Sequence, residues 1–284
     1  MCRWIAYSGT PVLLSQVLLQ PKHSLIDQSL HSRMGVETTN GDGFGIGWYQ
    51  EETAEPAVLR DISPAWNNRN LREIARHTRS GLFFGHIRAS TGTAVQQSNC
   101  HPFRSGRWMW MHNGAISEFH RLRRDLALAV DPSLYADIEG STDSELMFFL
   151  ALTFGLTEDP PAAVARMAGL IETTADARGV PLPLQMTVAV TDGERVWAFR
   201  YSSEGRSRSL YVSAEVDALR ALHPDVSFLR ELSDETRLVV SEPLGDLPGA
   251  WNEVPENSYG VVQPGESALH DFRPEYAGLP PSGR

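Results

Sequence analysis

The chain has 284 residues, of which 42% are hydrophobic, and its formal net charge is −10 at pH 7. This length supports one sizeable core without requiring a second domain, and the acidic charge argues against nucleic acid or an anionic membrane as a general partner. The presence of only two cysteines argues against a disulfide framework and favours a reducing compartment, so we expect a cytoplasmic protein. We expect neither a signal peptide nor a membrane span, because the sequence has no suitable apolar run.

The predicted elements follow two periodicities along the chain. Strands are predicted where β-branched and aromatic residues lie between turn residues, over 3–8, 44–50, 81–87, 108–112, 186–191, 195–201 and 237–241. Helices are predicted over 70–78, 118–129, 143–154 and 162–177. This order of strands, helices and strands indicates sheets packed between helix layers. We expect one domain over 1–272 and a tail rich in Pro and Gly over 273–284.

Two local patterns predict how particular elements begin and turn. Asp192-Gly193 predicts a tight hairpin between two strands, because these residues adopt the positive φ angles that such a turn needs. Thr142 and Glu145 have the spacing of a capping box at the start of the helix 143–154. Both patterns are explained by structure alone.

Cys2 directly follows Met1 and begins a predicted strand. A small residue at this position permits removal of Met1, which leaves a cysteine that carries both a thiol and a free α-amino group. A thiol with a pKa of about 8.5 and an amine with a pKa of about 7.7 to 8.0 titrate close together, so one residue can supply nucleophile and acid or base. The alternative is a small apolar residue at the start of an ordinary strand, and the pair Met-Cys alone favours that alternative.

Glycine occupies every second position from Gly41 to Gly47. Alternate side chains of a strand share a face, so these glycines leave one face bare and another group must approach the backbone closely. A neighbouring sheet and a ligand are equally compatible with this pattern. A dinucleotide-binding motif is disfavoured, because the glycines lie inside an aromatic strand instead of opening a helix.

Three further segments carry groups that recognise ligands. Arg88, at the end of a strand, presents a planar fork of donors that suits a carboxylate, and Thr91 can add a hydroxyl donor. The Asn113 amide and the Gly114 N–H can point at one position, as an oxyanion hole requires. Asp143, in the first turn of a helix, can receive an ammonium group. Each also has an ordinary explanation when taken alone: a solvated arginine, a turn dipeptide and a carboxylate that stabilises a helix.

Together these groups describe a consistent site. They comprise a nucleophile with an attached amine, two oxyanion donors, a cation for a carboxylate and an anion for an ammonium group. The last two match the head of an α-amino acid. A substrate with this head at one end and an amide at the other is glutamine or another γ-glutamyl amide.

The order of these motifs resembles that of the class-II glutamine amidotransferases, which are N-terminal nucleophile hydrolases. The matching motifs lie at 1–2, 40–45, 86–91, 99–102, 112–114 and 141–145, and 241–244 and 251–255 are similar to later family features. The resemblance implies an α+β fold, a four-layer αββα sandwich with two mostly antiparallel sheets, formed by a single type-2 domain over 1–272. It also implies roles for particular residues: Cys2 as nucleophile, Asn113 and Gly114 as oxyanion hole, Arg88 and Thr91 at the substrate carboxylate, Asp143 at the substrate ammonium group and His101 as a support that shapes the site.

Departures from the larger amidotransferases indicate a subgroup. Ala89 and Gly92 stand where the enzymes that make amino sugars often have Trp and His, and we expect no synthase domain. The chain is most similar to the stand-alone γ-glutamyl amidohydrolases of glutathione degradation and of the ergothioneine pathway. The segment 64–71 is particularly similar to the glutathione-degradation type.

Three functions are compatible with these features. The favoured one is hydrolysis of the γ-glutamyl amide bond of glutamine or a γ-glutamyl peptide through an N-terminal cysteine and a thioester, with no cofactor. The second is a glutaminase subunit that delivers ammonia to a separate synthase, and a synthase or a peptidase is the protein partner to test. The third is a non-catalytic protein that binds amino acids. Cys100, His101 and His112 match no standard metal-ligand spacing, so we expect no metal site.

Overall fold

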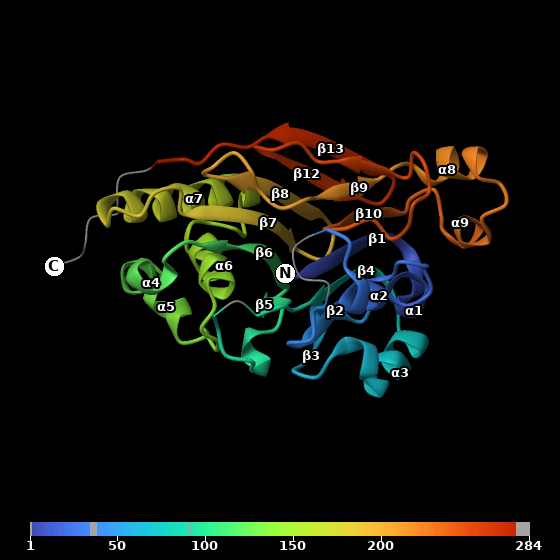
Figure 1. The fold of residues 1–284 in the computed structure, drawn as a ribbon, viewed down its shortest axis with the longest axis horizontal. Coiled ribbons are helices and arrows are strands. Elements are labelled where there is room, and N and C mark those ends of the chain that lie inside the picture. The colour runs from blue at the N-terminus through green and yellow to red at the C-terminus, as the bar shows by residue number, and fades with distance from the viewer. Residues whose placement is uncertain (1, 35–38, 91, 277–284) are drawn as a thin grey trace.

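The computed structural model describes residues 2–34, 39–90 and 92–276, so Met1, Thr91 and the last part of the expected tail lie outside the described residues. Two sheets of antiparallel strands face each other, and helices cover their outer faces (Figure 1). The four-layer αββα sandwich implied by the resemblance is therefore confirmed.

The first sheet places the N-terminal strand at its centre. Its strand order is β11-β9-β10-β1-β4-β2-β3, and β1 pairs antiparallel with both β10 and β4. The strands are β1 (Arg3–Leu13), β2 (Phe44–Gln50), β3 (Thr53–Asp61), β4 (Arg79–Ile87), β9 (Tyr211–Ser213), β10 (Arg237–Val240) and β11 (Trp251–Glu253). The start of β1 therefore lies beside the ends of two neighbouring strands.

The second sheet leaves part of one strand edge open. Its order is β13-β12-β8-β7-β6-β5, and the short β5 pairs only with the first residues of β6. The strands are β5 (Phe103–Ser105), β6 (Trp108–Ile116), β7 (Leu184–Thr191), β8 (Val196–Ser202), β12 (Ser258–Gln263) and β13 (Glu266–Asp271). Beyond β5, the outer edge of β6 is free to present backbone groups.

Helices pack on the two outer faces of the sheets. The helices α1 (Leu14–Leu18), α2 (Leu25–His31) and α3 (Arg69–His77) cover the first sheet. The second sheet is covered by α4 (Phe119–Leu128), α6 (Asp143–Thr153) and α7 (Pro160–Ala177), with α5 (Pro132–Tyr135) beside them. The helices α8 (Val216–Leu222) and α9 (Ser227–Glu231) lie at one end of the molecule (Figure 1). None of the helices in the described part of the chain is long and apolar enough to cross a membrane.

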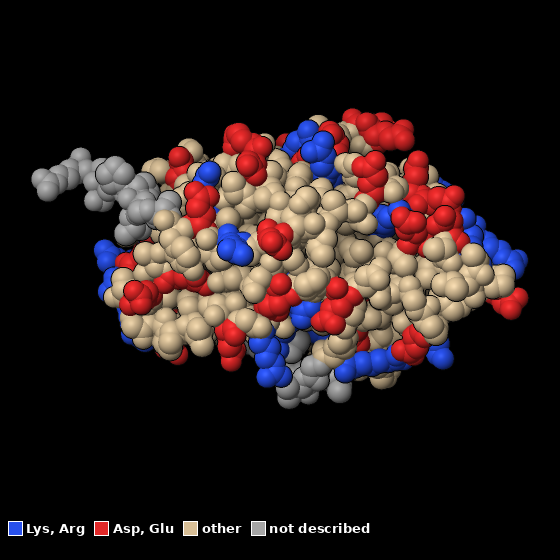
Figure 2. All heavy atoms as spheres, turned by 90° about the horizontal axis from the view of Figure 1, so that it is seen from above, with Lys and Arg blue, Asp and Glu red and all other residues tan. Residues whose placement is uncertain are grey.

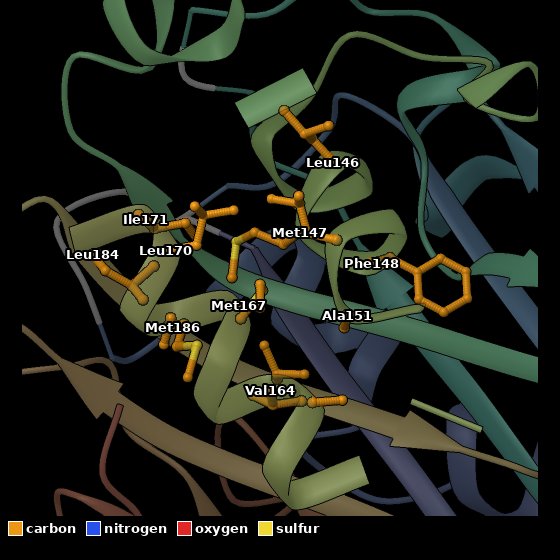
Figure 3. Close-up of a cluster of buried hydrophobic side chains, with 14 of the residues drawn as sticks. Leu146, Met147, Phe148, Ala151, Val164, Met167, Leu170, Ile171, Leu184 and Met186 are labelled. Carbon is orange, nitrogen blue, oxygen red and sulfur yellow. The ribbon is translucent and has the colours of Figure 1, made fainter. Parts of the chain in front are cut away.

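Strand alternation divides the core into three layers. In β1, Ile5 and Tyr7 face the helices of the first sheet, whereas Trp4 and Ala6 pack between the sheets. The third layer joins α6 and α7 to the second sheet. Figure 3 shows its members, which include Leu146, Met147, Phe148 and Ala151 of α6, Val164, Met167, Leu170 and Ile171 of α7, and Leu184 and Met186 of β7.

The hairpin between β7 and β8 is confirmed, but its loop is longer than a two-residue turn. Thr191 pairs with Val196, which leaves residues 192–195 as the loop. The Asp192 carboxylate accepts two backbone N–H groups inside this loop, at 2.9 and 2.8 Å. These local hydrogen bonds stabilise the wider turn.

The alternating glycines are explained by the second sheet. A Cβ atom on Gly45 would lie 2.0 Å from the His101 carbonyl oxygen, and one on Gly47 would lie 2.4 Å from the Met109 sulfur. The neighbouring sheet and the loop before it therefore require the bare strand face. The earlier glycines precede β2, which begins at Phe44.

The chain after β13 packs along α7. The Glu275 N–H donates to the Ala165 carbonyl oxygen at 2.9 Å, and the Tyr276 hydroxyl donates to the Glu172 carboxylate at 2.6 Å. A Cβ atom on Gly169 would lie 2.1 Å from the Glu275 carbonyl oxygen. The described beginning of the expected tail is thus held against the helix.

Candidate active site

Strand alternation directs three of the predicted site residues to one end of the space between the sheets. Side chains that are an even number of residues apart in a strand point to the same face. This spacing separates a side chain that packs between the sheets from Cys2, from Arg88 and from Asn113. These reference side chains are Trp4 in β1, Phe84 in β4 and Met111 in β6.

The Cys2 thiol lies against the backbone of Ala89. The Ala89 N–H donates to Sγ at 3.4 Å, and the thiol donates to the Ala89 carbonyl oxygen at 3.5 Å. Burial raises the pKa of the thiol, while the Ala89 hydrogen bond and the nearby charges of Arg88 and Arg3 oppose this rise. The thiol therefore needs an additional base or positive charge nearby to react as a thiolate at neutral pH.

The Asn113 side chain contacts the backbone of Cys2. Its Nδ2 donates to the Cys2 carbonyl oxygen at 3.0 Å. A primary amide carries two N–H groups, so one remains for another acceptor. Asn113 lies within β6, which continues to Ile116, so the prediction that the strand ends at His112 is wrong.

The Gly114 N–H points to the free edge of β6. N–H groups of consecutive residues in a strand point to opposite edges, and the Ile116 N–H donates to the Asp143 carboxylate at 2.8 Å. Gly114 lies two residues earlier and so directs its N–H to the same side. Glycine is required here, because φ is 154° and a Cβ atom would lie 1.9 Å from the Gln185 carbonyl oxygen.

Arg88 is a buried cation, 3% exposed, that is held by neutral oxygen atoms. Its Nη2 donates to Thr93 Oγ1 at 2.7 Å, to the Ala94 carbonyl oxygen at 3.1 Å and to Ser90 Oγ at 3.2 Å, and its Nη1 donates to the Asp42 carbonyl oxygen at 3.4 Å. Within the described residues it forms no ion pair with a carboxylate. Its charge is therefore available to an anionic ligand.

Asp143 begins α6 and is held by backbone and hydroxyl donors. Its Oδ2 accepts the Ile116 N–H, and its Oδ1 accepts the Ser144 N–H at 2.8 Å and the Ser144 hydroxyl at 3.2 Å. His112 Nδ1 lies 2.7 Å from Ser144 Oγ. Among the residues that the structure describes, no Lys or Arg pairs with this carboxylate, so it can receive a ligand's positive charge.

The start of α6 carries half of the predicted capping box. Thr142 Oγ1 accepts the Glu145 N–H at 3.2 Å, which confirms Thr142 as the cap. The Glu145 carboxylate instead accepts the N–H groups of Glu139 at 3.0 Å and Gly140 at 2.7 Å. Glu145 therefore holds the turn before the helix.

His101 lies in the wall of the site as a neutral ring. Its ring lies 4.0 Å from that of His86 between centroids, tilted by 36°, and meets Phe103 edge-on at 4.5 Å. Burial lowers the pKa of His101 well below its usual value and that of His86 to about 3. Within the described residues, His101 has no hydrogen-bond partner on either ring nitrogen, and no group of three His, Cys, Asp or Glu side chains is arranged to hold a metal ion.

The predicted residues border one cavity of about 510 Å³. Its lining includes Cys2, Arg88, His101, Gly114 and Asp143, and Asn113 adjoins it through the contact with Cys2. Thr91, the remaining predicted residue, lies outside the described residues. The structure thus brings together the groups whose residue types and positions predicted a site for one amino-acid amide.

One side of the cavity was not predicted. Phe119, His120 and Arg123 of α4 line it beyond Gly114. The basic residues of this helix looked like a solvated face, which is the ordinary position for exposed arginines. The tertiary path of β6 into α4 brings them to the cavity.

A buried ionic cluster supports the start of β1. Arg3 Nη1 donates to the Cys2 carbonyl oxygen at 2.9 Å, and Arg3 Nε donates to Glu242 at 2.6 Å. His23 Nε2 lies 2.6 Å from the other Glu242 oxygen. The motif around Glu242 is visible in the sequence but this contact is not, because Arg3 and Glu242 are 239 residues apart.

Comparison with protein families identifies the class to which this site and fold belong. The family model for class-II glutamine amidotransferases matches residues 13–277. The chain therefore belongs to the class-II glutamine amidotransferases. It is an enzyme of the amide-hydrolysing type.

Similar curated proteins have names that agree with this class. The chain is 34% identical to the probable glutamine amidotransferase DUG3 of Saccharomyces cerevisiae, over 97% of this chain and 85% of that protein. It is 27% identical to the γ-glutamyl-hercynylcysteine sulfoxide hydrolase of Mycolicibacterium smegmatis, over 90% of this chain and 93% of that protein. These relatives support action on glutamine or γ-glutamyl amides.

Solved structures agree with the fold. A glutamine aminotransferase class-II domain protein from Silicibacter pomeroyi has a TM-score of 0.71 and 32% identity, covering 96% of this chain and all of that chain. A structure described as the allosteric regulatory enzyme of purine biosynthesis has a TM-score of 0.66 at 14% identity, covering 95% of this chain and 49% of that chain. The second likeness shows the fold alone.

Proposed function

We propose that this enzyme hydrolyses the γ-glutamyl amide bond of glutamine or a γ-glutamyl peptide, with Cys2 as an N-terminal nucleophile. The observation that carries this proposal is the shared cavity of the Cys2 sulfur, the Arg88 guanidinium and the Asp143 carboxylate. The two charges complement the carboxylate and the ammonium group of an α-amino acid, and the sulfur is the group proposed to attack its amide end. The family and the named relatives support the same chemistry.

The first chemical step forms a thioester. The Cys2 α-amino group takes the thiol proton and becomes an ammonium group, and the sulfur attacks the γ-carbonyl carbon. The carbonyl oxygen becomes an oxyanion that accepts hydrogen bonds from the free N–H of the Asn113 amide and from the Gly114 N–H. The C–N bond then breaks, and the departing nitrogen takes a proton from the Cys2 α-ammonium group. The products of this step are an amine or ammonia and a γ-glutamyl thioester.

The second step regenerates the enzyme. A water molecule gives a proton to the free α-amino group and attacks the thioester, which releases glutamate and the Cys2 thiol. Each step uses groups of the chain and water. Removal of Met1 is required, because an amide in place of the α-amine can neither accept nor donate this proton at neutral pH.

We extend the proposal to the setting of the enzyme. Residues 1–272 act as one glutamine amidotransferase type-2 domain, which is supported by the core layer shared by both sheets. The protein acts in the cytoplasm, which is supported by the free thiols of Cys2 and Cys100.

The test measures glutamate release from glutamine and from a panel of γ-glutamyl peptides, using protein whose intact mass shows loss of Met1. We expect turnover, and a loss of more than about a thousandfold in Cys2→Ala, because the variant lacks the sulfur that forms the thioester. Cys100→Ala is the matched control. Full activity in purified Cys2→Ala would contradict the proposed nucleophile.

The same panel distinguishes the alternatives. Preference for peptides supports a γ-glutamyl amidohydrolase, and preference for glutamine supports a subunit that passes ammonia to a synthase. Binding of glutamate by correctly processed protein without any turnover would indicate a binding protein and contradict the proposal.

A further inference from the structure

Asn99 joins the loop after β4 to the turn before α6. It ends the short helical turn Gln97–Asn99, and its side chain is fully buried. Its Nδ2 donates to the Ala94 carbonyl oxygen at 2.9 Å, and its Oδ1 accepts the Ser141 N–H at 2.8 Å. One side-chain amide therefore uses its donor and its acceptor to hold two segments, of which the second lies 42 residues further along the chain.

Each of these segments carries one charged residue of the cavity. The Ala94 carbonyl oxygen that accepts from Asn99 also accepts from the Arg88 guanidinium at 3.1 Å. Ser141 lies two residues before Asp143. A continuous series of contacts therefore runs from the Arg88 cation through Asn99 to the turn that positions the Asp143 carboxylate.

The turn before α6 is held on its other side by Glu145, whose carboxylate accepts the N–H groups of Glu139 and Gly140. A Cβ atom on Gly140 would lie 2.6 Å from Asn99 Oδ1 and 2.7 Å from Glu145 Oε2. The backbone is thus closely enclosed by two buried side chains. The distance between this turn and the loop that carries Arg88 depends on the length of the Asn99 side-chain amide.

We propose that Asn99 is a positioning residue that sets the separation between Arg88 and Asp143, and so makes the enzyme selective for substrates with both a carboxylate and an ammonium group. This inference rests on the proposed function, because it assumes that these two residues bind an α-amino acid head. Asn99 is not among the described residues that line the cavity, so it acts through the segments it joins. Misplacing a binding group by 1 Å typically costs about a hundredfold in rate.

The test uses a matched pair of chromogenic substrates with Met1-free protein. γ-Glutamyl-p-nitroanilide carries both head groups, whereas glutaryl-p-nitroanilide lacks only the ammonium group. We expect the ratio of their kcat/KM values to fall by about tenfold or more in Asn99→Ala, because the loss falls mainly on the substrate that uses both charges. Asn99→Asp keeps an acceptor for Ser141 but removes the donor to Ala94, and it should lower the ratio less.

Two controls separate positioning from general damage. Gln97→Ala changes the same helical turn but, within the described residues, removes only a hydrogen bond to the Arg60 carbonyl oxygen, so it should keep the wild-type ratio. The rate at which iodoacetamide alkylates Cys2 should stay unchanged in every variant.

An unchanged substrate ratio in folded Asn99→Ala, or an equal loss on both substrates, would overturn the inference while leaving the proposed function intact. Failure of both Asn99 variants to fold would also overturn it, because Asn99 would then be a structural residue. Absence of wild-type turnover on both substrates would instead contradict the proposed function, and with it the inference.

Discussion

At the residue scale, the surroundings of Cys2 work against its reactivity while its α-amino group is blocked. Burial raises the pKa of the thiol, and the Ala89 backbone together with the Arg88 and Arg3 charges offsets this only in part. Removal of Met1 would place an ammonium group on the same residue. A positive charge this close favours the thiolate. Removal of Met1 therefore both frees the α-amine that acts as base and lowers the pKa of the thiol.

We predict two different pH profiles for alkylation of Cys2 by iodoacetamide. In protein that retains Met1, the rate should rise with an inflection above the ordinary thiol pKa of about 8.5, because burial favours the neutral form. In Met1-free protein the inflection should lie at lower pH. Mass spectrometry of the N-terminal peptide follows the reaction, and Cys100→Ala removes the other thiol. Equal inflections in the two forms would contradict the predicted effect of processing.

At the element scale, β6 supplies several groups of the site because its outer edge is free beyond β5. Asn113 contacts Cys2, Gly114 directs its N–H to the open edge, and Ile116 holds the Asp143 carboxylate. The same strand packs Trp110 against α6. A displacement of β6 therefore moves the Asn113 amide, the Gly114 N–H and the N–H that holds the Asp143 carboxylate together.

Gly114→Ala should damage both stability and catalysis. The new methyl group meets the Gln185 carbonyl oxygen at 1.9 Å, and φ is 154°, so β6 must move away from β7. We expect a loss of about 2 kcal/mol or more in the free energy of unfolding, and a fall of about a hundredfold or more in kcat. Urea denaturation and steady-state kinetics measure the two effects.

Gly245→Ala is the control for that substitution, because no atom lies within 4 Å of its added Cβ and its φ is not positive. Gly245→Ala should leave the free energy of unfolding and kcat near their wild-type values. Wild-type kcat in Gly114→Ala would show that the glycine does not position an oxyanion donor.

At the scale of the whole molecule, Glu242 connects segments from both ends of the chain. It follows β10 and binds Arg3 of β1, His23 before α2 and the backbone N–H of Arg33 at 2.8 Å. Burial by itself raises the pKa of this carboxyl, but these hydrogen bonds and the Arg3 charge outweigh burial and lower it. Because Arg3 also holds the Cys2 carbonyl oxygen, the cluster supports the position of Cys2 as well as the fold.

We predict that Glu242→Gln lowers the free energy of unfolding by about 3–5 kcal/mol at pH 7, because it removes one charge from a buried, hydrogen-bonded ion pair. Because the pKa of Glu242 is lower in the folded state, its charge stabilises the folded protein at pH values above the unfolded-state pKa of about 4.3. This stabilisation is lost as the pH falls through the folded-state pKa. The difference between wild type and variant should therefore shrink in acid. Urea denaturation over this pH range measures it.

Asp246→Asn provides the comparison, since it breaks an exposed ion pair with Arg33 whose aspartate side chain is 80% exposed. Such a pair contributes about 0–1 kcal/mol, so the control should change little at any pH. A pH-independent difference for Glu242→Gln would contradict the role of the Glu242 charge.

The molecule is acidic overall, and its charges are mixed on the surface. Figure 2 shows acidic side chains over much of one face, with Lys and Arg interspersed among them. The cavity presents charges of both signs to a ligand, because Arg88 and Asp143 each lack an ion-pair partner within the described residues. Local geometry, rather than net charge, therefore determines which ligand the site can hold.

The sequence alone determined the order of the motifs, the fold class and five of the residues that line the cavity, namely Cys2, Arg88, His101, Gly114 and Asp143. These features depend on residue type and on short-range periodicity: a cysteine after Met1, glycine on alternate strand positions and Thr142 as a cap. Elements too short to show a clear period, including α1, α2 and β9, were not predicted. The hairpin of β12 and β13 was also missed.

Only the tertiary structure decided how distant segments meet. The approach of His101 to Gly45, the contact of Arg3 with Glu242 and the connection through Asn99 all join residues that are far apart in sequence. Local periodicity tells which face of a strand a side chain occupies, but it does not tell which segment packs there. That choice depends on the complete arrangement of sheets and loops, which therefore determines the spacing of the charged groups around the cavity.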